Sequence, residues 1–312
     1  MKKLILSIML GSLVFASIPV DRVEAAGAAS VEVLLDTKKM SFPDAKPFQD
    51  SQGSVMVPIR FVSEALGAKV SYSKSGKTTV VGVTNKDHTV KMTVGQTTAL
   101  IDGKKKSYGT KIILKQNRTF VPLRLVSEGL GQKVEWDKVG RWVWIGEKNF
   151  RSTDDKEFKI KSMNELKTYF AKTSNRLENM YGEKFEGVKV ITRNQLPIQL
   201  GDGQVIYSID LVKINGNEYI KIRSTERGTP IDFLTKSDFV KGRFSLDSLF
   251  ENNGDSTANN YYPVISNSDK FQNGTYVSSV DPTKFKLKNV DYITFATSKP
   301  REYIVAIANP FK

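Results

Sequence analysis

One stretch of fourteen residues occurs twice in this chain. "VPIRFVSEALGAKV" runs from Val57 to Val70, and "VPLRLVSEGLGQKV" runs from Val121 to Val134, sixty-four positions later. Extended without gaps to residues 57–82 and 121–146, the two segments share thirteen identities in twenty-six positions. Self-similarity of this kind indicates a repeated structural unit. We therefore expect the same small set of elements to be built twice.

Each copy predicts a strand, a short helix and a hairpin. Apolar runs lead into Pro58 and Pro122, which suit the first turn of a helix because the N–H that proline lacks would be unbonded there. Apolar residues then recur with helical spacing up to Gly67 and Gly131, which tolerate the positive φ of a helix end. Two alternating segments around a turn follow in each copy, which is typical of a β-hairpin.

Two charged pairs stand at i and i+4 on these helices, Arg60 with Glu64 and Arg124 with Glu128. Such a pair stabilises a helix by ~0.2–0.5 kcal/mol, so we interpret both as structural. Upstream, "LLDTKKMSF" and "LIDGKKKSY" extend the similarity. Because neither copy is large enough to bury its helix alone, we predict that both share one α+β domain.

The two segments resemble a known family. "VPIRFVSEALGAKVSYS" and "VPLRLVSEGLGQKVEWD" are similar to the Val-Pro-Leu-Arg, Glu-x-Leu-Gly and Val-x-Trp signatures of the copper amine oxidase N-terminal-like domain. This domain, also called the stalk domain, occurs in secreted proteins of Bacillus-like bacteria. The resemblance covers residues ~31–146, and Tyr72 and Ser73 depart from the usual Trp-Asp. The residues that carry it are Pro58, Arg60, Glu64, Gly67, Pro122, Arg124, Glu128, Gly131 and Trp136.

The resemblance does not imply amine oxidase activity. In the oxidases that give the family its name, the domain resembles an appendage, and histidines hold copper beside a tyrosine-derived quinone. This chain has one histidine, His88, and no cysteine, so it cannot build the nitrogen-rich site that copper prefers. A Ser-His-Asp triad is excluded from residues 151–312, which contain no histidine. We predict no catalytic residue, no cofactor and no metal site.

The N-terminus predicts export. Lys2 and Lys3 precede an apolar run, and small residues follow at Val23 and Ala25, which is the layout of a cleaved signal peptide. The run is shorter than the ~20 residues of a spanning helix. We expect cleavage near Ala25, a mature chain without a transmembrane segment, and a secreted protein that its hydrophobic core holds together without disulfides.

The second half predicts another α+β domain, of no family that we recognise. Residues 147–161 are polar and indicate a linker, so we place the first domain at 26–146 and the second at 162–312. Ser162 and Glu165 fit a capping box that opens a long helix ending at Gly182. Strands around Asn215-Gly216 form a strong hairpin signal. We expect that long helix to lie on an antiparallel sheet, with further strands in "YYPVIS", "FKLKNVDYITFAT" and "EYIVAIAN".

Two features of the first domain are candidates for ligand binding. Residues 26–150 hold 20 Lys+Arg and 11 Asp+Glu, a net charge of +9, against +4 for residues 151–312. Lys104, Lys105 and Lys106 stand in a Gly-flanked turn and either meet a polyanion or only keep the protein soluble. Trp142 and Trp144 point to one face of a strand, where they either stack on sugars or pack against the second domain.

These features together predict a secreted, non-catalytic protein of the cell envelope. The stalk-type domain would attach to an anionic wall polymer or extracellular surface, and the second domain would engage an unknown partner, such as another secreted protein. Nothing in the sequence predicts a dedicated nucleic-acid site. Two alternatives stay open, namely a wall- or polysaccharide-active hydrolase with carboxylates in residues 162–312, and an accessory subunit or inhibitor of another secreted protein. The acids named for the hydrolase are Asp202, Asp210, Glu226 and Asp232.

Overall fold

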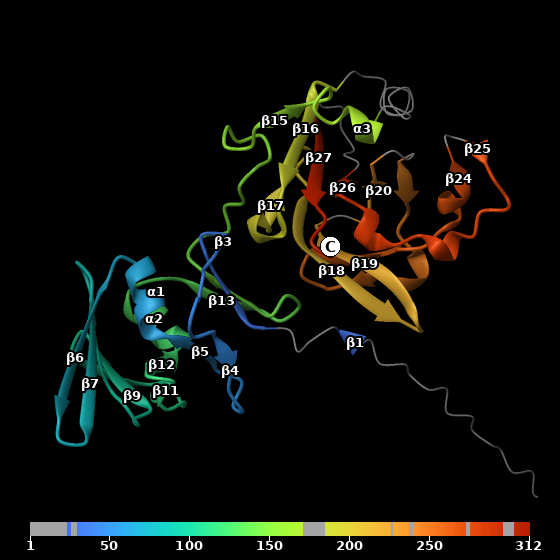
Figure 1. The fold of residues 1–312 in the computed structure, drawn as a ribbon. Helices are drawn as coiled ribbons and strands as arrows, with labels where there is room; N and C mark the ends of the chain where they lie inside the picture. Colours follow the sequence, from blue (N-terminus) through green and yellow to red (C-terminus); the bar gives the residue numbers. More distant parts are fainter. Residues whose placement is uncertain are drawn as a thin grey trace, which may run out of the picture.

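The chain forms two bodies, one drawn in blue to green and the other mostly in light green to red (Figure 1). The structure is a computed structural model and describes residues 24–25, 30–170, 185–225, 227–236, 240–272, 275–295 and 303–312. These residues are mostly β-sheet with few helices. Buried apolar side chains gather in two main clusters, one between Val31 and Ile145 and the other between Phe158 and Ile307.

Three sheets and two short helices build the first body. One sheet has the order β11 (Ile113–Lys115), β12 (Arg118–Pro122), β5 (Val55–Pro58), β4 (Phe48–Gln49). The second has the order β13 (Val134–Asp137), β14 (Trp142–Ile145), β2 (Glu32–Leu35), β3 (Lys38–Lys39). The third has the order β10 (Lys104–Ser107), β9 (Thr98–Ile101), β8 (Thr89–Thr93), β7 (Thr78–Thr84), β6 (Lys69–Ser75).

In both repeated segments, the strand ends at a proline and a helix begins at the next residue. β5 ends at Pro58 and β12 ends at Pro122, and in each case a helix begins at the next residue, α1 (Ile59–Ala65) and α2 (Leu123–Gly129). Gly67 and Gly131 follow the helices with φ of 70° and 77°, the left-handed conformation that glycine adopts without strain. A hairpin follows each glycine, β6–β7 and β13–β14.

Two six-stranded sheets build the second body. One has the order β1 (Glu24–Ala25), β18 (Val205–Ile214), β19 (Asn217–Ser224), β23 (Ala258–Pro263), β22 (Glu251–Asn252), with β17 (Ile198–Gln199) also on β18. The other has the order β15 (Ile160–Ser162), β16 (Gly187–Ile191), β27 (Tyr303–Ala308), β26 (Tyr292–Phe295), β20 (Ile231–Leu234), β21 (Lys241–Arg243). Their facing apolar side chains form the second core.

Short elements complete this body. A two-stranded sheet pairs β24 (Phe271–Gln272) with β25 (Thr275–Tyr276). The 3₁₀ turns are η1 (Arg193–Gln195), η2 (Asp247–Leu249), η3 (Asn267–Lys270), η4 (Pro282–Lys284) and η5 (Leu287–Asn289). The Asn-Gly hairpin is confirmed, since β18 and β19 pair around Asn215 and Gly216, with φ of 49° and 79°. Such positive φ values at both turn residues match the twist of the flanking strands.

Several expectations for the second half are wrong. The sheet is not purely antiparallel, because β16 and β27 run parallel. "FKLKNV" does not extend a strand, since Leu287–Asn289 forms the 3₁₀ turn η5. Residues 147–161, predicted to be a linker, contact the second body through Phe158, which is buried in the second core. This polar stretch therefore packs through its two aromatic residues, Phe150 against the Trp142–Trp144 cluster and Phe158 in the second core.

The long helix is described only at its start. Ser162 and Glu165 form the expected capping box, with Ser162 N–H donating to the Glu165 carboxylate at 3.0 Å and Glu165 N–H to the Ser162 hydroxyl at 3.2 Å. Ser162 is, however, the last residue of β15, and the helix α3 (Lys167–Phe170) begins only after an intervening turn; Tyr169 and Phe170 are buried as a core stripe predicts. The remainder of the predicted helix, to Gly182, falls within residues 171–184, outside the described residues.

The predicted signal peptide lies outside the described residues except for Glu24 and Ala25. These two residues form β1, which pairs antiparallel with Lys213 and Val212 of β18. Among the described helices, none has the length and apolar character needed to cross a bilayer.

Candidate functional site

The three neighbouring lysines lie on a strand rather than in a protruding turn. Lys104, Lys105 and Lys106 belong to β10, the edge strand of its sheet, and the turn before it is Asp102-Gly103. Side chains alternate along a strand, so Lys104 and Lys106 share one face and Lys105 takes the other. The expected lysine loop is therefore corrected to a lysine-rich edge, where charge also prevents pairing with another strand.

Lys106 reaches the helix of the second repeated segment. Its Nζ donates to Glu128 Oε2 at 3.0 Å, and Arg124 Nε lies 3.5 Å from Glu128 Oε1. The hydrogen bond to Glu128 raises the pKa of Lys106 above its ordinary value. One carboxylate thus stands between two cations. Lys104 and Lys105 form no ion pair within the described residues, so their charges face solvent.

A groove of about 660 Å³ opens beside this cluster. The half-buried ring of Trp136 lies in its wall, together with Tyr108, whose ring centroid is 5.3 Å from Lys106 Nζ. The sequence marks Trp136 only as a residue that carries the family resemblance. The other polar side chains of the wall are Gln52, Ser54, Ser107, Arg124, Glu128 and Glu135. These residues come from three separate segments of the chain, so only the fold brings them together.

Trp142 and Trp144 are covered at the junction of the two bodies. They are 4% and 3% exposed and form one cluster with Leu34, Phe150 and Tyr207. The Trp142 and Trp144 rings lie 6.3 and 6.4 Å from the Tyr207 ring, centroid to centroid. Almost none of either indole is exposed, so this geometry favours packing, the second of the two interpretations.

An ion pair beside these tryptophans joins the second hairpin to the second body. Arg223 NH1 on β19 lies 2.5 Å from Asp137 Oδ2 on β13, and their side chains are 4% and 8% exposed. Arg223 NH2 also lies 2.7 Å from Asp255, and its guanidinium lies 4.8 Å from the Tyr207 ring. A Cβ at Gly140 would come within 2.9 Å of Arg223 NH1, so a larger residue there would displace this guanidinium.

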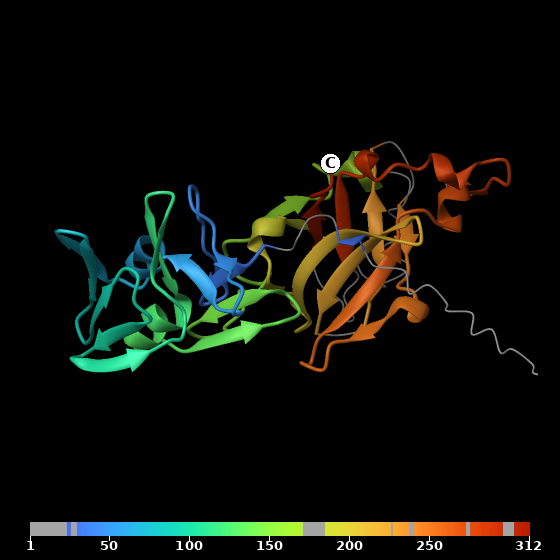
Figure 2. The same ribbon diagram turned by 90° about the horizontal axis from the view of Figure 1, so that it is seen from below.

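Sequence reasoning missed this junction ion pair. The only signal was a difference between the copies, Asp137 in the second against Ser73 in the first. Figure 2 shows, from below, the green hairpin β13–β14 reaching toward the yellow strands of the second body.

His88 makes one polar pair at the surface. It immediately precedes β8, and its Nδ1 lies 2.9 Å from Asp102 Oδ2. This hydrogen bond is the largest cause that lowers the pKa of Asp102. Within the described ranges, no three His, Cys, Asp or Glu side chains gather as a metal site would require.

The acids named for a hydrolase make separate local contacts in the structure. Asp210 pairs with Arg193 at 2.5 Å, and Asp202 accepts from the backbone N–H of Gln204. Asp232 lies on β20 and is half-buried, and Glu226 is outside the described residues.

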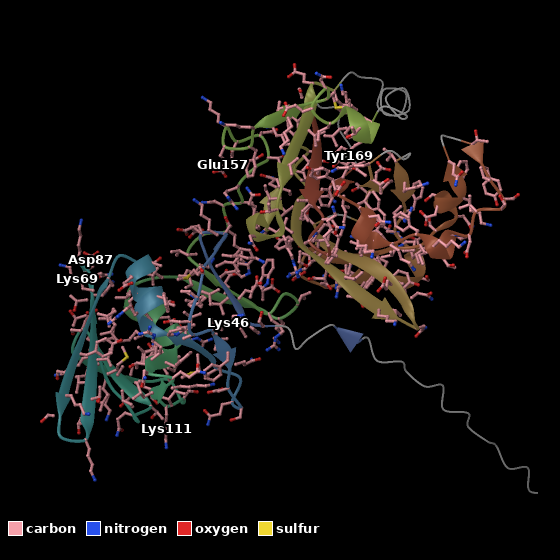
Figure 3. The ribbon with its side chains drawn as sticks, in the orientation of Figure 1. Lys46, Lys69, Asp87, Lys111, Glu157 and Tyr169 are labelled. Carbon is pink, nitrogen blue, oxygen red and sulfur yellow. The ribbon has the colours of Figure 1, made fainter. Side chains whose placement is uncertain are left out.

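Basic side chains project from more than one side of the first body. Figure 3 labels Lys46, Lys69 and Lys111 at separate places on it, and all three are exposed. The excess positive charge is therefore spread around this body, and β10 supplies its densest run.

Comparison with known families agrees with the geometry of the first body. A family model described as the copper amine oxidase N-terminal domain matches residues 34–145, and the rest of the chain is unrecognised. The domain by itself is non-catalytic in amine oxidases, which fits the prediction that this chain has no amine oxidase activity. No curated protein matches the chain.

Proposed function

We propose that this chain is a secreted, non-catalytic binding or spacer protein of the cell envelope. Its first body, residues 26–146, would attach to an anionic wall polymer or extracellular surface. The second body, residues 162–312, would engage a partner such as another secreted protein. The observation that carries the proposal is the net charge of +9 on residues 26–150, with Lys104 and Lys105 unpaired among the described residues.

The ionic character of the surface supports attachment rather than chemistry. Exposed lysines on an edge strand attract a polyanion without having to be buried. Salt weakens this attraction, because the screening length falls from ~10 Å at 0.1 M salt to ~3 Å at 1 M. The family match to a domain that is non-catalytic in amine oxidases points the same way.

A salt titration tests this proposal. The mature chain, starting at Ala26, is mixed with purified anionic wall polymer and sedimented at rising salt concentration. We expect binding at ~0.1 M salt and release toward ~1 M, because the contacts are exposed charges. Retention that does not change over this range would contradict an ionic attachment. Hydrolysis of the polymer during the incubation would favour the carboxylate hydrolase instead.

A further inference from the structure

The two repeated segments meet at equivalent positions. β5 and β12 pair antiparallel with Val57 opposite Val121, and these two residues are sixty-four positions apart, the spacing of the sequence repeat. An antiparallel pair centred on equivalent residues has an approximate two-fold axis between them. The sheet order β11-β12-β5-β4 extends the relation outward on both sides.

Each hairpin joins strands that precede the other copy. β14 of the second copy pairs with β2, while β7 of the first copy lies in one sheet with β8, β9 and β10. β2 and β9 hold the matching upstream segments "EVLL" and "TALI". The two copies therefore interlock around β5 and β12, although β8, which lies between β7 and β9, has no counterpart between β14 and β2.

The approximate two-fold axis predicts a second groove beside α1, and the structure has one there. The groove beside α2 includes Pro122, Arg124 and Trp136, and it is closed by Gly53, Ser54 and Val55 of the first copy. A groove of about 460 Å³ beside α1 includes Pro58, Arg60 and Tyr72. It is closed by Asn117, Arg118 and Thr119 of the second copy, each sixty-four positions beyond a counterpart.

Both grooves combine an aromatic ring with two cations. In the first groove Tyr72 is 44% exposed and the Arg60 guanidinium lies 5.8 Å from its ring; Arg118, which also pairs with Asp44, is a further lining residue. In the second, Arg124 and Lys106 accompany Trp136, and both contact Glu128, which lines the same groove, so a ligand carboxylate would share these cations with Glu128. A ring beside polar groups suits a sugar, which has apolar C–H faces and hydroxyl edges, and a guanidinium fork matches a carboxylate. A polyphosphate would gain from the cations but not from the ring.

We propose that the two grooves are equivalent subsites for a polysaccharide that carries carboxylate groups, with Tyr72 and Trp136 as the stacking rings. This inference rests on the proposed attachment to an anionic polymer and names its chemical class. Volumes of about 460 and 660 Å³ lie within the usual ~300–1,000 Å³ range of small-ligand pockets. Each groove would take a short stretch of the chain and leave the rest in solvent.

Calorimetry with three probes on the mature chain tests the proposal. An oligogalacturonate supplies sugar rings and carboxylates, a malto-oligosaccharide supplies rings alone, and polyphosphate supplies charge alone. We expect the oligogalacturonate to bind best, with two oligosaccharides per chain. Tyr72→Ala and Trp136→Ala should each weaken one site at least about tenfold, the loss typical of an aromatic hot spot. Tyr72→Trp and Trp136→Tyr, which exchange the residues of the two copies, should keep both sites.

Phe244→Ala is the matched control, because this aromatic residue is 70% exposed and belongs to the second body. Circular dichroism melting shows that each variant is folded. Oligogalacturonate binding that both alanine variants leave intact would overturn the proposal, as would an equal loss of polyphosphate binding in Trp136→Ala. In those cases salt-dependent wall binding could still hold, whereas failure of the mature chain to bind any polyanion would overturn both proposals.

Discussion

The two hairpins of the first body share a sequence pattern and differ in surroundings. β13–β14 carries Asp137, Trp142 and Trp144 into the junction, and all four residues of β14 are buried. β6–β7 carries Ser73, Thr78 and Val80 at the equivalent positions, and most of β6 is exposed. The hydrophobic alternation that makes both segments hairpins is retained.

The comparison shows which residues decide the fold and which decide the contacts. Val143 and Ile145 on one face of β14 join the first core, as do Val81 and Val83 of β7. The opposite face of β14 is buried only because large aromatic side chains meet Tyr207 and Phe150 there. A few substitutions on one face therefore convert a solvent-facing hairpin into a connection between two bodies.

The largest expected effect comes from removing a junction ring. Trp144→Ala should lower the free energy of unfolding by ~3–5 kcal/mol, the usual cost of deleting a buried aromatic side chain. Val80→Ala, at the equivalent position, should cost less than ~1 kcal/mol because Val80 is only half-buried. Urea denaturation followed by tryptophan fluorescence measures both values. Equal losses would show that the hairpins do not differ as described.

An exchange between the copies tests the ion pair. Asp137→Ser, which brings in the residue at position 73, should lower the free energy of unfolding by ~1.5–3 kcal/mol, because Arg223 loses a charged hydrogen bond in a buried place. The reverse change, Ser73→Asp, should alter it by less than ~0.5 kcal/mol at an exposed site. Chemical denaturation gives both numbers, and a cost below that of the exposed Arg193→Ala control would refute a structural role for the pair.

A third test addresses a position that the copies share. Ser63 and Ser127 are fully buried at equivalent positions, and neither hydroxyl has a hydrogen-bond partner among the described residues. Ser127→Ala should therefore raise the free energy of unfolding by ~1 kcal/mol, since an unsatisfied buried hydroxyl is unfavourable. Ser63→Ala should do the same. A loss of stability in thermal melts of either variant would mean that the hydroxyl is bonded.

The smallest expected effect concerns acid. Burial would raise the pKa of Asp255, but hydrogen bonds from Thr257 and the charge of Arg223 bring it below its ordinary value of 3.8. A carboxylate with a lowered pKa stabilises the fold above that value and loses its contribution as the pH falls through the folded pKa. Because its side chain is 40% exposed, we expect less than ~1 kcal/mol.

Denaturation of the parent chain and Asp255→Asn between pH 6 and pH 2 measures this contribution. The two curves should converge at the acid end. Curves that stay parallel throughout would exclude the linkage.

Local signals in the sequence predicted local structure well. The prolines at 58 and 122, the glycines at 67 and 131 and the Asn-Gly turn mark changes of backbone direction, because each residue type restricts or permits particular φ values. Pairing between distant strands could not be predicted in the same way. The parallel contacts of β14 with β2 and of β16 with β27 depend on how whole segments pack.

The candidate site was predicted only in part. Lys106, Arg124 and Glu128 were named separately, and the fold brings them together through β10 and α2. Trp142 and Trp144 were offered as either exposed or packed, because a tryptophan on a strand face fits both, and the covering Tyr207 lies far along the chain. Tyr72 and Trp136 could not be predicted as ligand residues. Each lies in a groove that is completed by residues of the other copy, and only the fold brings these together.

The central claim is that the basic first body attaches the chain to a polyanion. The most direct measurement compares two double variants of the mature chain. One carries both Lys104→Glu and Lys105→Glu on β10, and the other carries both Lys284→Glu and Lys288→Glu in the second body. Both remove the same charge from exposed positions. At ~0.1 M salt, the first variant should lose most of its binding to purified wall polymer while the second keeps it. Equal loss in both, or none in either, would contradict the claim.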